Sequence, residues 1–72
     1  MPVTDDVKNL VREYRKELGI TQEDLAEKLG VSRQTIISIE NGRYIPSLPL
    51  ALKMARFFQC KTDELFSLQE KG

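Results

Sequence analysis

The feature that most constrains the fold is residues 21–42, TQEDLAEKLGVSRQTIISIENG. Thr21 is a good helix N-cap, and Asp24, three positions later, can reach back to it in a short form of the capping box. Three apolar residues then recur at helical spacing on one face: Leu25, Ala26 and Leu29. Gly30 can adopt the left-handed conformation that ends a helix. The pattern predicts a helix over residues 22–29.

A second helix follows after a very short turn. Ser32 can cap it, Val31 fills the corner, and Asn41 with Gly42 ends it, which predicts a helix over residues 33–41. Its buried positions are Thr35, Ile36 and Ile39. The small Ala26 allows a close helix crossing, and a turn this short favours the steep angle of a helix-turn-helix unit.

Linked motifs at fixed spacing extend this pattern over most of the chain. They are LGITQEDLAEKLGVSRQTI, then IENGRYIPSL, then LALKMARFF and TDELF. Together they resemble the Cro/repressor-type (Xre-like) helix-turn-helix family over residues 7–66. The resemblance implies an all-α, five-helix lambda-repressor-like DNA-binding domain. We expect one domain over residues 1–72, with helices at 6–18, 22–29, 33–41, 48–59 and 63–68.

Composition is consistent with a small globular protein and argues against several functions. Of the 72 residues, 40% are hydrophobic and 31% charged, a balance that suits a packed domain. The sequence has no apolar run long enough to span a membrane and no signal-peptide pattern, so we expect a cytoplasmic protein without membrane contact. One cysteine and no histidine argue against a disulfide framework and a zinc site, and we expect no cofactor.

The charge balance is unusual for a nucleic-acid binder, which is commonly basic. Eleven basic and eleven acidic residues give zero net charge. The distribution is uneven, however, because residues 32–56 hold one acid, Glu40, against four cations, Arg33, Arg43, Lys53 and Arg56. This arrangement predicts a modest positive face on a neutral molecule.

The resemblance and the exposed face of the second helix indicate which residues contact DNA. The base-reading positions are Arg33, Gln34, Ile37 and Ser38. Arginine pairs with guanine, glutamine pairs with adenine, and isoleucine can pack on a thymine methyl group. The positions that match phosphate contacts are Gln22, Ser32, Asn41, Arg43 and Tyr44. Two alternatives remain open: Ile37 could belong to a protein interface, and Tyr44 could simply pack over its loop.

The resemblance also implies a largely buried ion pair between Arg15 and Glu40. The alternative is that both are solvated surface charges. Such a pair would orient helices more than it would stabilise the domain.

The first and fourth helices carry the remaining apolar residues. In the first helix the positions expected to face the core are Val7, Leu10, Val11, Tyr14 and Leu18. In the fourth helix one expected core face is Leu48, Ala51, Leu52, Ala55 and Phe58, and Leu65 should close the core. A second stripe and two residues near the C-terminus predict a homodimer interface of Leu50, Met54, Phe57, Phe66 and Leu68.

The preferred function is therefore a sequence-specific DNA-binding transcriptional regulator, a repressor that binds double-stranded DNA as a homodimer. The rival is a protein-interaction module, such as the antitoxin of a toxin–antitoxin pair or a transcriptional bridging factor. Zero net charge and Ile37 favour this rival, which implies a protein partner. An enzyme is not expected, because the sequence contains no histidine, no phosphate-binding glycine loop and no evident carboxylate pair.

Overall fold

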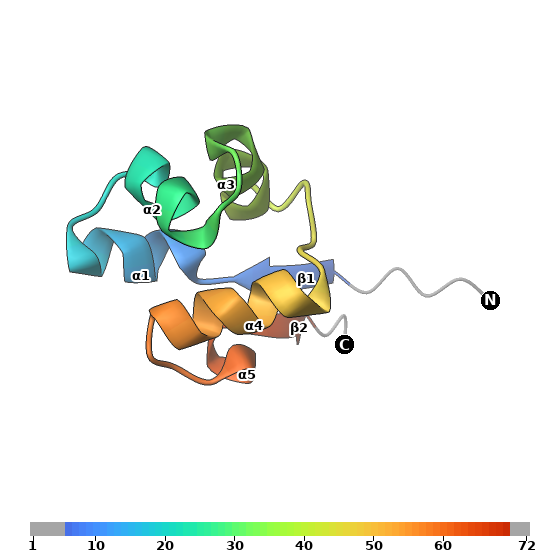
Figure 1. Cartoon of the computed structure of the whole chain (residues 1–72). Coiled ribbons are helices and arrows are strands. Elements are labelled where there is room, and N and C mark those ends of the chain that lie inside the picture. The colour runs from blue at the N-terminus through green and yellow to red at the C-terminus, as the bar shows by residue number, and fades with distance from the viewer. Residues whose placement is uncertain (1–5, 70–72) are drawn as a thin grey trace.

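The computed structural model describes residues 6–69, which form five helices and one small sheet (Figure 1). In chain order the elements are β1 (Asp6–Asn9), α1 (Val11–Leu18), α2 (Gln22–Leu29), α3 (Arg33–Glu40), α4 (Leu48–Phe57), α5 (Thr62–Leu65) and β2 (Phe66–Gln69). The expected five-helix fold is confirmed. The two strands are an addition that leaves the class unchanged.

The central helix pair follows the local signals in the sequence closely. The Thr21 hydroxyl accepts the backbone N–H of Asp24 at 3.0 Å, and the Asp24 carboxylate accepts the backbone N–H of Thr21 at 3.1 Å. Gly30 ends α2 in the left-handed conformation, at φ 73°. The hydroxyl of Ser32 then accepts the backbone N–H of Thr35 at 3.1 Å and starts α3. Side-chain caps and one glycine thus define this turn.

The prediction of a first helix starting at residue 6 is wrong. Residues 6–9 form β1, which pairs with β2 in an antiparallel ribbon, with Val7 opposite Leu68 and Asn9 opposite Phe66. The backbone N–H of Leu10 also donates to the carbonyl of Leu65 at 3.0 Å and extends the ribbon toward α1. A four-residue segment gives little periodicity, and its pairing partner lies about sixty residues away in the chain.

The same ribbon explains the other differences at the chain ends. The expected helix over residues 63–68 is only one turn, because β2 begins at Phe66. Leu10 and Leu18 were expected in the core but are 46% and 55% exposed, whereas Val11 is completely buried. The start of α1 at residue 11 therefore shortens the predicted apolar face of the first helix.

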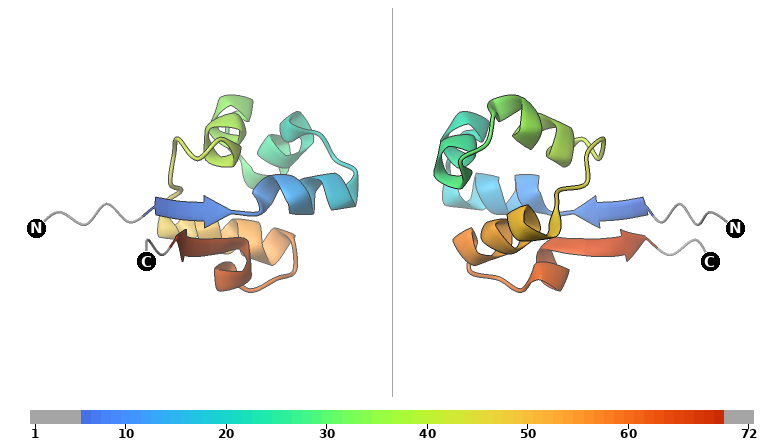
Figure 2. Two further views of the ribbon diagram at one scale, coloured as in Figure 1. Left: turned by 180° about the vertical axis from the view of Figure 1, so that it is seen from behind. Right: turned by 45° about the vertical axis from the view of Figure 1, so that its right-hand side comes forward.

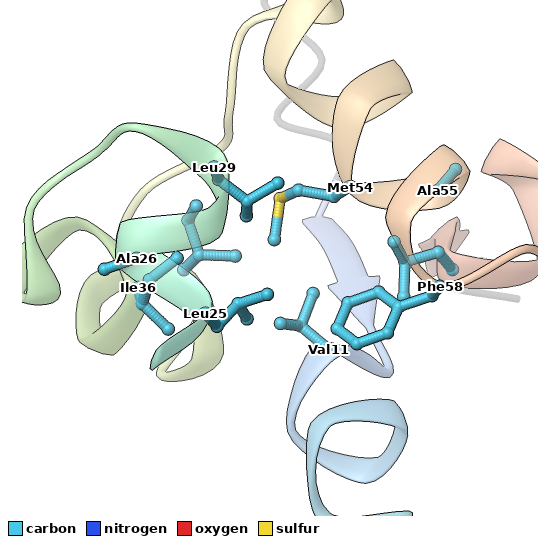
Figure 3. Packing of buried hydrophobic residues seen from close by; sticks show 10 residues of the cluster. Val11, Leu25, Ala26, Leu29, Ile36, Met54, Ala55 and Phe58 are labelled. Atoms are coloured by element: carbon cyan, nitrogen blue, oxygen red, sulfur yellow. The ribbon is translucent and has the colours of Figure 1, made fainter. Parts of the chain in front are cut away.

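The core lies where α1, α2, α3, α4 and α5 meet (Figure 3). Its buried members are Val11, Leu25, Ala26, Leu29, Ile36, Ile39, Met54, Ala55, Phe58 and Leu65. The predicted buried positions of α2 are confirmed, as are Ile36 and Ile39 of α3 and the closing role of Leu65.

Helix α4 is rotated relative to the expected core face. Met54 was assigned to an outer stripe but is completely buried, so its side chain is not available to a partner. Leu48 and Leu52 were expected in the core but are 68% and 50% exposed. Contacts with neighbouring elements set this rotation. One of them joins the ammonium group of Lys53 to the carbonyl of Leu29 at the end of α2, at 3.0 Å.

The elements are arranged so that α3 lies away from α4, α5 and β2. In both views of Figure 2, α2 and α3 lie on one side of β1, and α4, α5 and β2 lie on the other. The open end of the ribbon lies near the start of α4 (Figures 1 and 2). Among residues 6–69, no helix has the length and apolarity needed to cross a membrane.

Candidate DNA-reading surface

Helix α3 presents a polar face to solvent along its whole length. Arg33 and Gln34 are exposed in its first turn, and Ile37 and Ser38 are partly buried in the next. The opposite face is anchored by buried Ile36 and Ile39. The four predicted base-reading residues therefore share one accessible face on a helix that the core holds rigidly. A single helix of this kind fits the major groove, which is about 12 Å wide.

Two hollows flank α3. The first, of about 570 Å³, lies at the start of α2 and is lined by Arg15, Gly19, Ile20, Thr21, Gln22, Glu23 and Arg33. The second, of about 230 Å³, is lined by Ser32, Gln34, Thr35, Ser38 and Tyr44. The first brings Gln22 beside Arg33, and the second brings Tyr44 beside Gln34 and Ser38. Residues predicted to bind the DNA backbone therefore lie next to residues predicted to read the bases.

Glu40, the one acid of α3, is hidden from this surface. The Glu40 side chain has no exposed area, and its carboxylate accepts from the Arg15 Nε at 2.7 Å and Nη2 at 3.2 Å. These are the two residues for which the resemblance implied a buried pair. Arg15 also donates from Nη1 to the Ile20 carbonyl at 2.9 Å. The positive charges of Arg33 and Arg43, both exposed, therefore face no exposed carboxylate from α3 itself.

Glu40 joins three helices. Besides Arg15, its Oε1 accepts from Arg12 Nε at 3.4 Å and from Gln22 Nε2 at 3.1 Å, so α1, α2 and α3 meet at one carboxylate. Burial acts to raise the pKa of Glu40. The hydrogen bonds from Arg15 and Gln22 and the arginine charge outweigh burial and hold the pKa below its ordinary value of 4.5. The carboxylate therefore stays charged and keeps α3 docked on α1 and α2.

Three of the predicted phosphate-binding side chains already have partners within the domain. Gln22 donates to Glu40 and retains one amide N–H, and the Ser32 hydroxyl caps α3. The Asn41 side-chain oxygen accepts from Arg12 at 3.0 Å. Arg43 and Tyr44 are exposed on the loop after α3. The described surface thus offers N–H and O–H donors around α3, the groups that hold phosphate oxygens.

Sequence reasoning missed two residues that organise this surface. Arg12 joins α1 to the end of α3 through Glu40 and Asn41. Asn9 accepts the backbone N–H of Val11 at 3.1 Å and donates to the Ile39 carbonyl at 2.9 Å. Asparagine just before a helix is a recognisable turn signal. Nothing in the sequence distinguishes Arg12 from the other exposed arginines.

Comparison with known proteins identifies the family to which this domain is similar. A family model described as helix-turn-helix matches residues 11–65. An HTH-type transcriptional regulator of Methanocaldococcus jannaschii is 55% identical over 64 residues, covering 89% of this chain and 97% of the relative. The HTH-type transcriptional regulator YgzD of Bacillus subtilis is 48% identical over 66 residues, covering 92% and 100%.

A solved structure agrees with these relatives. The restriction-modification controller protein C.AhdI of Aeromonas hydrophila superposes with a TM-score of 0.68 at 33% identity, covering 75% of this chain and 78% of that one. The matching proteins form a DNA-binding class without enzymatic activity. The family match spans the buried core, the turn and α3 together. The chain belongs to the Xre-like helix-turn-helix family and is a DNA-binding regulator of transcription.

Proposed function

We propose that the protein recognises a specific operator by inserting α3 into the major groove. In this proposal the base edges are read by Arg33, Gln34, Ile37 and Ser38. The observation that carries the proposal is that these four side chains share the accessible face of a helix whose other face is fully packed. Arginine and glutamine supply bidentate contacts, and Ile37 supplies an apolar contact for a thymine methyl group.

The DNA backbone would be held from both ends of α3. Gln22 and Ser32 lie near its start, and Asn41, Arg43 and Tyr44 follow its end. Hydrogen-bond donors in this arrangement fix the register on the duplex without reading sequence. We propose repression as the mode of action, because a protein bound at a promoter excludes polymerase. The site of action would be the cytoplasm, where DNA is directly accessible in cells without a nucleus.

We propose further that two copies bind one operator. Operator affinities of about 10⁻⁸–10⁻¹¹ M need more contact than one eight-residue helix makes. Leu48 and Leu68 are 68% and 63% exposed, on α4 and β2 respectively. The start of α4 and the end of the ribbon lie toward the same end of the domain (Figure 1). Covering this end by a two-fold partner would hide both leucines.

Of the interface residues expected from the sequence, Leu68 is exposed at this end of the domain. Leu50, Phe57 and Phe66 are partly buried against the core, and Met54 is left out because it lies in the core. The two α3 helices would lie about 34 Å apart, one turn of DNA, and the operator would be an inverted repeat.

Selection of bound sequences from random duplexes at fixed salt tests both parts of the proposal. We expect an inverted repeat with half-sites about 10 base pairs apart, and binding that weakens steeply with salt. Sedimentation at micromolar concentration should show self-association, and Leu68→Glu should give a folded monomer with weaker operator binding. A clean monomer that selects no sequence would instead favour a protein partner for the exposed leucines.

A further inference from the structure

The Asn41 side chain is fixed in one orientation by its neighbour Arg12. Asn41 caps the end of α3 and is exposed, and its Oδ1 accepts from Arg12 Nη2 at 3.0 Å. A guanidinium group has only donors, so the amide atom that faces it must be the carbonyl oxygen. The NH₂ group of Asn41 therefore points away from Arg12, where it can donate to an external acceptor.

Arg12 is itself held by the buried network beneath it. Its Nε donates to Glu40 Oε1 at 3.4 Å, so the flat guanidinium group contacts two successive residues at the end of α3. Glu40 cannot shift easily, because Arg15 and Gln22 hold its two oxygens and its side chain has no exposed area. Arg12 is 44% exposed at its side chain and lies at the border of the network and the solvent.

We infer that Arg12 is a positioning residue for DNA binding, which acts by orienting the Asn41 amide toward a phosphate. The inference rests on the proposed function, in which Asn41 donates to the DNA backbone. Without Arg12 the amide would rotate freely, because the terminal torsion of asparagine is broad and roughly two-fold. In the wrong orientation the carbonyl oxygen would face the phosphate, and two acceptors would meet.

The expected loss is small but measurable. Ordering one side chain on binding costs enough to change affinity about two- to tenfold. Arg12→Ala should therefore weaken binding to a duplex half-site by about that factor, for every sequence alike. Lys16→Ala is the matched control, because Lys16 is an exposed cation on the same helix. It should change half-site affinity less than Arg12→Ala does.

A double-mutant cycle separates orientation from simple charge. The half-site affinities of the wild type, Arg12→Ala, Asn41→Ala and the double variant are measured by fluorescence anisotropy at fixed salt. If Arg12 acts through Asn41, adding Arg12→Ala to Asn41→Ala should cause no further loss. An undiminished loss in the Asn41→Ala background would mean that Arg12 attracts phosphates directly, and it would overturn the inference.

A second measurement uses the free protein and needs no DNA. The nitrogen order parameter of the Asn41 side chain should be high in the wild type and fall below about 0.6 in Arg12→Ala. An unchanged order parameter would overturn the inference. If Asn41→Ala leaves half-site affinity unchanged, the phosphate role of Asn41 in the proposed function fails, and the inference fails with it. A weaker half-site affinity of Asn41→Ala together with an unchanged order parameter in Arg12→Ala would overturn the inference alone.

Discussion

Breaking the ion pair between Arg15 and Glu40 should destabilise the domain strongly. The Glu40 side chain is fully buried and that of Arg15 is 12% exposed, so each charge would lose its main partner while most of its side chain is out of water. Leaving one buried charge without its partner costs about 3–5 kcal/mol, whereas replacing both by apolar residues costs far less. We expect the loss of stability in Arg15→Met to lie at the lower end of this range, because Glu40 still accepts hydrogen bonds from Arg12 and Gln22.

The magnitude is large relative to the whole stability of such a small protein. A core of this size rarely supplies more than about 3–5 kcal/mol, so each single variant should be largely unfolded at room temperature. Adding trimethylamine N-oxide, which favours the folded state, keeps enough of each variant folded for its free energy of unfolding to be measured. Urea unfolding then gives the free energy of unfolding for the wild type, Arg15→Met, Glu40→Leu and the double variant.

In this double-mutant cycle the losses in the free energy of unfolding should be strongly non-additive. We expect the double variant to lose less than either single variant, so that its loss lies well below the sum of the two single losses. Lys16→Ala is the control for removing a cation from α1, and it should stay within about 0.5 kcal/mol of the wild type. Two additive losses below about 1 kcal/mol each, as exposed pairs show, would refute the reasoning.

Four further variants test the surface and its support. Arg33→Ala should weaken binding to the preferred operator by about 1–3 kcal/mol and relax the choice at one base position, and equal losses on operator and random duplexes would contradict its base-reading role. Arg43→Ala should weaken binding to all sequences alike and make the affinity depend less steeply on salt concentration. Asn9→Ala removes the hydrogen bond that the Val11 N–H donates to Asn9 and the one that Asn9 donates to Ile39 of α3, so the free energy of unfolding should fall by about 1–3 kcal/mol. The exposed Lys8→Ala is the control in the same urea titration and should leave the free energy of unfolding unchanged. Because the pKa of Glu40 in the folded state lies below its ordinary value of 4.5, its ion pair with Arg15 stabilises the fold above pH 4.5, and this contribution is lost as the pH falls through the folded pKa. Between about pH 5 and pH 3 the free energy of unfolding of Glu40→Gln should therefore decline less than that of the wild type. Parallel curves for the two proteins would contradict this.

The local signals of the helix pair could be predicted because each acts within a few residues. Thr21 with Asp24, Gly30, and Ser32 with its helix each set one boundary of α2 or α3, and the structure has those boundaries within one residue of the expected ones. The bond between Arg15 and Glu40 could be anticipated only from the family resemblance, since twenty-five residues separate the two.

The parts that sequence reasoning missed depend on contacts between distant segments. The ribbon pairs β1 with β2 from opposite ends of the described chain, and neither strand is long enough to show a period of its own. On α4, periodicity identified apolar residues on more than one side but could not choose the side that faces α2. The choice buries Met54 and exposes Leu48 and Leu52, and it depends on how α4 packs against the other helices.

Zero net charge is compatible with the proposed mode of DNA binding if most of the acidic side chains lie away from the duplex. At physiological salt, charges more than about 8 Å apart are largely screened, so the local arrangement matters more than the total. Around α3, burial under two arginines removes Glu40 from the surface, and Asp24 is engaged in capping α2. Glu23 lines a hollow together with Arg15 and Arg33. If α3 reads DNA as proposed, we expect the local field there to be positive although the protein is neutral, with weak long-range attraction and recognition left to short-range contacts at α3.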